Sequence, residues 1–147
     1  PVSNNDAFWP DLPETLAARY RARMKMSLDG AEGAYHIQGY ADGEIRINDV
    51  RHTESLLVTP DTLVTEWGPD SLRALNEAHL TSVHELEPEV VLLGTGAQQT
   101  FPDRELILGL LQAGIGLEIM DTASACRTYN VLMSEGRRVV AALIIDR

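Results

Sequence analysis

The sequence is poor in the residues that several common kinds of protein require. Its single cysteine, Cys126, excludes an internal disulfide framework. Its longest uninterrupted apolar run covers only residues 139–145, which is too short to cross a bilayer. The 12 basic residues stand against 22 acidic ones, and this net charge of −10 argues against electrostatic binding of nucleic acid. No basic-then-apolar pattern follows Pro1, so we expect no signal peptide and a cytoplasmic location.

What is present is an ordinary globular composition. The 147 residues are 44% hydrophobic and 23% charged, which suits one domain with a buried core. Lysine occurs once, at Lys25, and this preference for arginine is associated with G+C-rich bacterial genomes, so we expect a bacterial source. We predict a flexible N-terminal extension over residues 1–33 and a single α/β domain over residues 34–147, because an Asp- and Gly-rich boundary separates them.

Residues 12–25 of the extension carry one amphipathic stripe. Apolar side chains recur there every four residues, and basic side chains flank them. Two interpretations stay open: a helix that docks on anionic lipid or on a partner, and a solvated extension of the kind that chain termini often form. Any membrane contact is expected to be peripheral and to use this stripe.

Residues 34–67 contain short runs in which apolar and polar side chains alternate, a pattern typical of β-strands. Asp42 and Gly43 are a turn signal between two such runs, so we expect a β-hairpin or meander at the start of the domain. Two further short strands are predicted over residues 55–59 and 62–67, because Pro or Gly-Pro stops each run.

A helical stretch is predicted after these strands. Asp70 or Ser71 can cap it, and Asn76 or Thr81 divides it into two short pieces. Trp67, at the edge of the β-region, is expected to anchor the core or its edge rather than to bind a ligand.

The second half of the domain has a strand–helix repeat. The predicted strands cover residues 89–93, 115–120 and 138–145. The helices between them begin after Asp103 and at Asp121 or Thr122, which are suitable capping residues. The first strand is continuously apolar and should be buried on both faces. We therefore predict an α/β fold with three layers and a mixed, largely parallel central sheet, preceded by the hairpin or meander.

Two features of this fold should meet at the carboxyl ends of the strands, where ligands usually bind. One is a glycine turn and the other is a helix start, and both can present backbone N–H groups to an anion. The candidate binding surface comprises Gly94, Thr95, Gly96, Thr122, Cys126, Arg127, Thr128, Tyr129, Asn130 and Arg137. The turn lacks the full dinucleotide fingerprint and a P-loop lysine, so a tight exit from the strand is favoured over a nucleotide site.

Candidates for catalysis are weaker. Cys126 lies near a helix start, where a thiol can become nucleophilic, but the four histidines are remote and have no diagnostic spacing to it. We therefore predict a buried, structural cysteine, no catalytic residue, no metal site and no cofactor. Arg137 and its neighbour Arg138 are expected to bind terminal helix carbonyls or to pair with Asp121 or Glu135.

Several segments resemble a known family. These are residues 88–96, 116–122, 125–132 and 135–139. They are similar to motifs of the domain-of-unknown-function family numbered 498, which includes the mitochondrial NADH:ubiquinone oxidoreductase (complex I) assembly factor 3. The resemblance covers roughly residues 35 to 145. It implies a three-layer α/β fold with a mixed sheet and a protein partner, and it supplies no catalytic residues.

These observations rank the functional classes. A non-enzymatic assembly or interaction module, for a respiratory or other membrane complex, is expected first. The alternative is a protein that binds a small ligand or anion with the turn at Gly94, Thr95 and Gly96 and the helix start at Thr122. A thiol enzyme or redox sensor using Cys126 ranks last, so the balance is against an enzyme.

Overall fold

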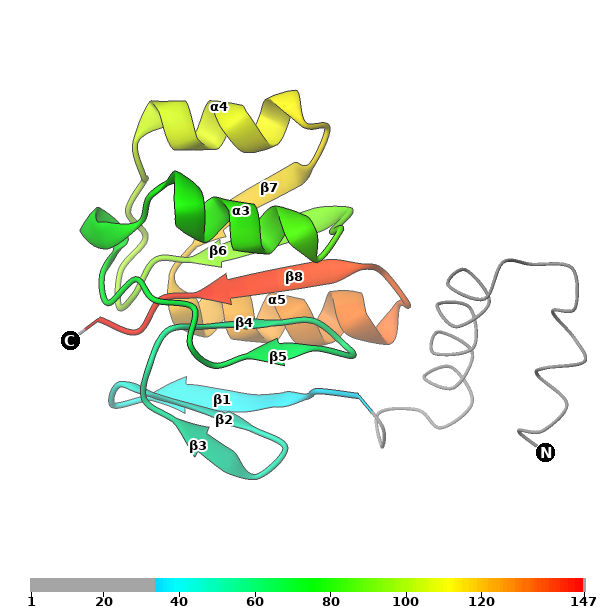
Figure 1. Cartoon of the computed structure of the whole chain (residues 1–147). Coiled ribbons are helices and arrows are strands. Elements are labelled where there is room, and N and C mark those ends of the chain that lie inside the picture. Colours follow the sequence, from blue (N-terminus) through cyan, green and yellow to red (C-terminus); the bar gives the residue numbers. More distant parts are fainter. Residues whose placement is uncertain (1–33, 147) are drawn as a thin grey trace, which may run out of the picture. The chain divides into compact units, whose positions relative to one another are not determined.

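The computed structural model describes residues 34–146, and the predicted extension over residues 1–33 lies outside this part of the chain. The strands are β1 (Ile37–Ala41), β2 (Glu44–Ile47), β3 (Val50–His52), β4 (Leu56–Val58), β5 (Leu63–Val64), β6 (Val90–Gly94), β7 (Gly116–Met120) and β8 (Val139–Leu143). The helical elements are the 3-10 turn η1 (Leu72–Ala74) and the helices α3 (Glu77–Glu85), α4 (Arg104–Gln112) and α5 (Thr122–Ser134). Figure 1 shows their arrangement.

The predicted meander is confirmed as a small antiparallel sheet in which β2 lies between β1 and β3. The turn that joins β1 to β2 places Asp42 and Gly43 at φ values of 54° and 74°. A two-residue hairpin turn with both φ values positive fits the right-handed twist of its strands, and Asp-Gly is a favoured pair there.

The larger sheet has the strand order β5-β4-β8-β6-β7. Strand β6 is parallel to both β7 and β8, whereas β4 is antiparallel to β8 and to β5. The sheet is therefore mixed, as predicted. The finer expectation of three layers around a largely parallel sheet is not confirmed, because the β4 half of the sheet is antiparallel. Every residue of β6 and β8 is buried, which agrees with their continuously apolar sequences.

Helices cover both faces of this sheet (Figure 1). On the face of α3 and α4, alternate strand residues such as Val91 and Leu93 join Val83 and Leu110 of the two helices in one apolar cluster. On the other face lies α5, whose buried residues include Tyr129. The small sheet lies beside α5, so α5 packs between two β-structures.

One predicted element is shorter in the structure, and one predicted division is confirmed. The strand expected over residues 62–67 is reduced to β5, and Trp67 instead packs beyond it, where its indole N–H donates to the His79 carbonyl at 3.0 Å. The helical stretch is divided at Asn76, because the Asn76 side chain accepts from the His79 N–H and caps α3. None of the helices over residues 34–146 is long and apolar enough to cross a membrane.

Candidate functional site

The turn after β6 and the start of α5 lie against each other. The Gly96 N–H donates to Thr122 Oγ1 at 2.8 Å, and the Thr122 N–H donates to the Gly96 carbonyl at 2.9 Å. The Thr122 hydroxyl in turn donates to the Ile144 carbonyl at 2.7 Å. Thr122 is fully buried. One hydroxyl therefore joins β6, α5 and the end of β8.

The glycines of this turn allow close packing. A Cβ on Gly94 would lie 3.0 Å from the Cα of Thr122 and 3.2 Å from the Leu143 side chain, so the helix could not approach a larger residue as closely. Gly96 has a φ of +102°, and the Asp146 carboxylate occupies the space where its side chain would be. This geometry matches the tight strand exit that the sequence favours over a nucleotide site.

Charge at this turn opposes an anionic ligand. The Thr95 N–H already donates a hydrogen bond to the Met120 carbonyl at 2.9 Å, and the Gly96 N–H already donates one to Thr122 Oγ1. Neither N–H is therefore available to an anion. The N-terminus of α5 is capped by Asp121, which accepts the Ser124 N–H at 2.8 Å. That hydrogen bond lowers the pKa of Asp121 below its usual value, so the carboxylate carries its charge at neutral pH. Asp121 and Asp146 would therefore repel an anion approaching the turn.

Two polar residues of α5 attach the small sheet. The Tyr129 hydroxyl donates to the Tyr35 carbonyl at 2.7 Å. The Asn130 side chain pairs with both backbone groups of Ile37: it donates to the carbonyl at 2.6 Å and accepts the N–H at 3.0 Å. Asn130 thus continues the hydrogen bonding of β1 as a neighbouring strand would.

Cys126 is packed into the same region, with 2% of its surface exposed. Burial raises the pKa of its thiol to about 12, and neighbouring Arg127 opposes this only in part. Burial also raises the pKa of Tyr129. Burial therefore favours the protonated thiol at neutral pH, which is the less nucleophilic form. Tyr40, which sequence reasoning overlooked, faces this cluster from β1: burial, Asp146 and Cys126 raise the pKa of its hydroxyl.

Of the remaining candidates, Arg127 lies close enough to the Asp121 cap to add to the effect of the Ser124 hydrogen bonds in lowering the pKa of that carboxyl, whereas Arg137 lies away from the turn. Arg127 is exposed and donates to the Ser124 hydroxyl at 3.0 Å, and Thr128 is half-buried. Arg137 pairs with Glu89 at 3.0 Å, beyond the opposite end of β6. This corrects the expectation that it joins the candidate surface or pairs with Asp121 or Glu135. The partner was missed because Glu89 is distant in sequence and becomes adjacent only when β6 and β8 align.

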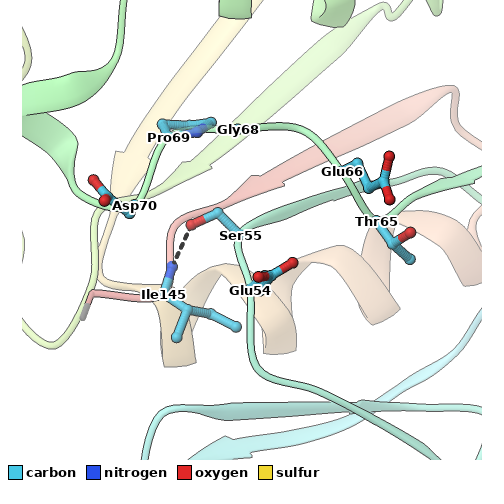
Figure 2. Close-up of a pocket in the computed structure, with 8 residues that line it drawn as sticks. All are labelled: Glu54, Ser55, Thr65, Glu66, Gly68, Pro69, Asp70 and Ile145. Atoms are coloured by element: carbon cyan, nitrogen blue, oxygen red, sulfur yellow. Dashed lines mark hydrogen bonds between the residues drawn. The ribbon is translucent and has the colours of Figure 1, made fainter.

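A cleft that sequence reasoning missed opens beside β4 (Figure 2). It has a volume of about 410 Å³. Its lining residues are Glu54, Ser55, Thr65, Glu66, Gly68, Pro69, Asp70 and Ile145. The β4–β5 hairpin register pairs Leu57 with Val64, and its extension brings the segment around residue 55 near residue 66. Equal hairpin arms around the Pro60 turn were the signal that could have placed them together.

The chemistry of this cleft is acidic. Glu66 and Asp70 are exposed on it, and Glu54 adds a third carboxylate. The Ser55 oxygen accepts the Ile145 N–H at 2.9 Å, which ties β4 to the end of β8. Over residues 34–146 no three His, Cys, Asp or Glu side chains are grouped to hold a metal ion. The cleft therefore favours a cationic group over an anionic one.

Fold and site together define a small mixed α/β protein whose buried polar groups mainly hold its own backbone. The chain belongs to the family described as protein of unknown function (DUF498/DUF598), whose profile matches residues 37–144. This confirms the family indicated by the sequence motifs.

The relatives of this chain include complex I assembly factors and a bacterial membrane protein. The complex I assembly factor 3 of Xenopus tropicalis is 32% identical over 122 residues, which cover 82% of this chain and 66% of that protein. The human assembly factor 3 is 32% identical over 126 residues, which cover 84% of this chain and 68% of that protein. A 13 kDa major membrane protein of Francisella tularensis is 31% identical, with 82% of this chain and 99% of that protein covered.

Solved structures share the fold. A Bordetella parapertussis protein superposes with a TM-score of 0.73 at 39% identity, covering 79% of this chain and 99% of that one. A Xanthomonas campestris protein has a TM-score of 0.70 at 44% identity, covering 79% and 88%. A Mth938-like domain of Bordetella pertussis has a TM-score of 0.69 at 32% identity, covering 78% and 88%.

Proposed function

We propose that this chain is a non-enzymatic interaction module that acts in the assembly of a respiratory or other membrane complex. The observation that carries the proposal is the similarity to complex I assembly factor 3, at about 32% identity over more than four-fifths of this chain. The chain spans about two thirds of those assembly factors, so their role is taken over here as a proposal.

The site chemistry supports binding rather than catalysis. Nucleophilic catalysis needs an activated group with a base beside it. Burial raises the pKa of the Cys126 thiol to about 12. The Thr122 hydroxyl is buried and donates its hydrogen bond to the Ile144 carbonyl. The polar residues that cluster on α5 serve to hold β1, β6 and β8 together. Because these interior polar groups are used to hold the fold, we expect the chain to act through contacts between its surface and other molecules.

Co-purification tests the proposed role. The full-length chain is tagged in its native cells, and the proteins that it retains are quantified against those retained by an untagged control. We expect subunits of a membrane complex, and native gels of cells lacking the protein should show less of the same complex. Recovery of soluble metabolic enzymes alone, with the complex at normal abundance, would contradict the proposal. Fractionation of these cells tests the proposed cytoplasmic location.

The alternative of a small-anion binding protein receives less support from the geometry. Its donors at Thr95 and Gly96 are already used, and two carboxylates lie beside the turn. A thermal-shift screen of nucleotides, phosphates and carboxylates distinguishes it. A true ligand at a hundred times its Kd would add about 2.7 kcal/mol to the free energy of unfolding, and we expect no such shift.

A further inference from the structure

A groove runs between α3 and α4 on the outer side of the sheet. It has a volume of about 190 Å³. Its lining residues are Glu77, Leu80, Thr81, His84, Glu105, Leu106, Gly109 and Leu110. On each helix these residues are three or four positions apart or adjacent, so each helix contributes one continuous face to the groove. None of them belongs to the turn at Gly96 or to the cleft at Ser55.

The groove has an apolar floor and an acidic rim. Leu80 and Leu106 are only partly buried, although both pack against the apolar core. Glu77 and Glu105 are exposed, one on each helix, and His84 is the remaining titratable group that lines the groove. An occupant with apolar residues along one face and basic residues beside them would match both parts of this surface.

Gly109 provides an independent observation. It lies inside α4, where glycine destabilises a helix relative to alanine. A Cβ built on Gly109 would meet nothing within 4 Å, so the packing of the described residues does not require a glycine there. A helix from another molecule could approach the α4 backbone closely at this position, because no side chain stands in its way.

We propose that the groove between α3 and α4 binds a basic amphipathic helix of a partner protein. The inference rests on the proposed role as an interaction module and names the surface and the partner chemistry. Apolar side chains of the partner helix lie on Leu80, Leu106 and Leu110, its backbone passes over Gly109, and its Arg or Lys residues pair with Glu77 and Glu105.

Selection from a library tests the chemistry of the partner. Peptides randomised on a helical scaffold and displayed on phage are selected against the full-length chain. We expect enrichment of peptides with an apolar stripe at helical spacing and with Arg or Lys beside it. Enrichment of acidic peptides, or of none, would overturn the proposal.

Variants then locate the binding surface by fluorescence anisotropy with the selected peptide. Gly109→Leu fills the groove and should weaken binding by about tenfold or more, a loss of about 1.4 kcal/mol. The same change should raise the melting temperature, because leucine is a better helix former than glycine. Glu105→Gln should weaken binding about two- to fivefold, as expected for one exposed ion pair. Glu118→Gln, on β7, is the matched control and should change nothing.

Two outcomes separate this inference from the proposed function. If Gly109→Leu binds the peptide as tightly as the native chain, or if its only effect is to turn a dimer into a monomer, the groove does not bind a partner helix. If that variant still recovers the membrane complex from cells, the assembly role stands without the groove. If neither chain recovers a complex, the assembly role itself fails.

Discussion

The two residues that follow β8, Ile144 and Ile145, make hydrogen bonds in two different parts of the molecule. The Ile144 carbonyl accepts the Thr122 hydroxyl inside a sealed junction with α5, whereas the Ile145 N–H donates to Ser55 at the floor of an open cleft. Both hydrogen bonds are buried, but the second lies beneath a cleft that carries the exposed carboxylates of Glu66 and Asp70. A cluster of polar residues in the sequence therefore does not by itself indicate a binding surface. The cluster can bind a ligand only if its donors and acceptors are not already paired within the fold.

The largest expected effect comes from breaking the sealed junction. Thr122→Val keeps the side-chain shape but leaves the Gly96 N–H and the Ile144 carbonyl without their partner. Each unsatisfied buried group costs about 1–3 kcal/mol, so the free energy of unfolding should fall by about 2–6 kcal/mol in urea titrations. Thr81→Val, on the exposed side of α3, is the control and should stay within about 0.5 kcal/mol. If both variants lose the same free energy of unfolding, the buried hydrogen bonds of Thr122 matter no more than the exposed one of Thr81.

A smaller loss is expected where α5 holds the meander. Asn130→Ala removes both hydrogen bonds to Ile37 and should lower the free energy of unfolding by about 1–3 kcal/mol. Hydrogen exchange should accelerate first at the Ile37 amide, because this amide loses its acceptor. Val131→Ala, on the exposed face of the same helix, is the matched control. Unchanged exchange at Ile37 would show that Asn130 does not hold β1.

The charge at the sealed junction gives a pH-dependent effect. The folded state lowers the pKa of Asp121, so its stabilising contribution is present above the usual value of 3.8 and is lost as the pH falls through the lower, folded value. Asp121→Asn keeps a good capping residue but removes the charge, and should cost about 0.3–1 kcal/mol at pH 7. Once the pH has fallen below the folded pKa of Asp121, the native chain and the variant should be almost equally stable. A constant difference across this range would exclude the charge as the cause.

The smallest effects are expected in the open cleft. Glu66→Gln and Asp70→Asn change exposed side chains, so each should alter the free energy of unfolding by less than about 0.5 kcal/mol. If either change costs as much as Thr122→Val, the cleft is part of the folding core and the contrast between the two environments is wrong.

The sequence predicted the elements better than it predicted the junctions between them. Apolar runs and capping residues located β6, α5 and β8, and the Asp42-Gly43 pair located the first hairpin. The mixed sheet was expected, but the extent of its antiparallel part was not, because nothing local in β4 fixes the direction of its neighbour. The strand over residues 62–67 was predicted too long, since tertiary packing drew Trp67 away from the sheet.

The candidate site was predicted in part for the same reason. The contact between the Gly94–Gly96 turn and Thr122 follows from strand–helix topology, and it was expected. The use of Asn130 as a partner for β1 joins residues 93 positions apart, and no local pattern reveals it. Arg137 was misplaced because its partner depends on the alignment of two strands. The groove between α3 and α4 was not anticipated, because it requires the spacing of two helices.

The central claim is that the polar residues of α5 maintain the fold whereas binding uses the outer surface. It is tested most directly by measuring stability and partner recovery on Asn130→Ala and Gly109→Leu in the full-length chain. We predict that Asn130→Ala loses stability but recovers the same amount of partner per folded molecule. Gly109→Leu should gain stability and lose recovery. The reverse result, with recovery lost in a fully folded Asn130→Ala and kept in Gly109→Leu, would contradict the account.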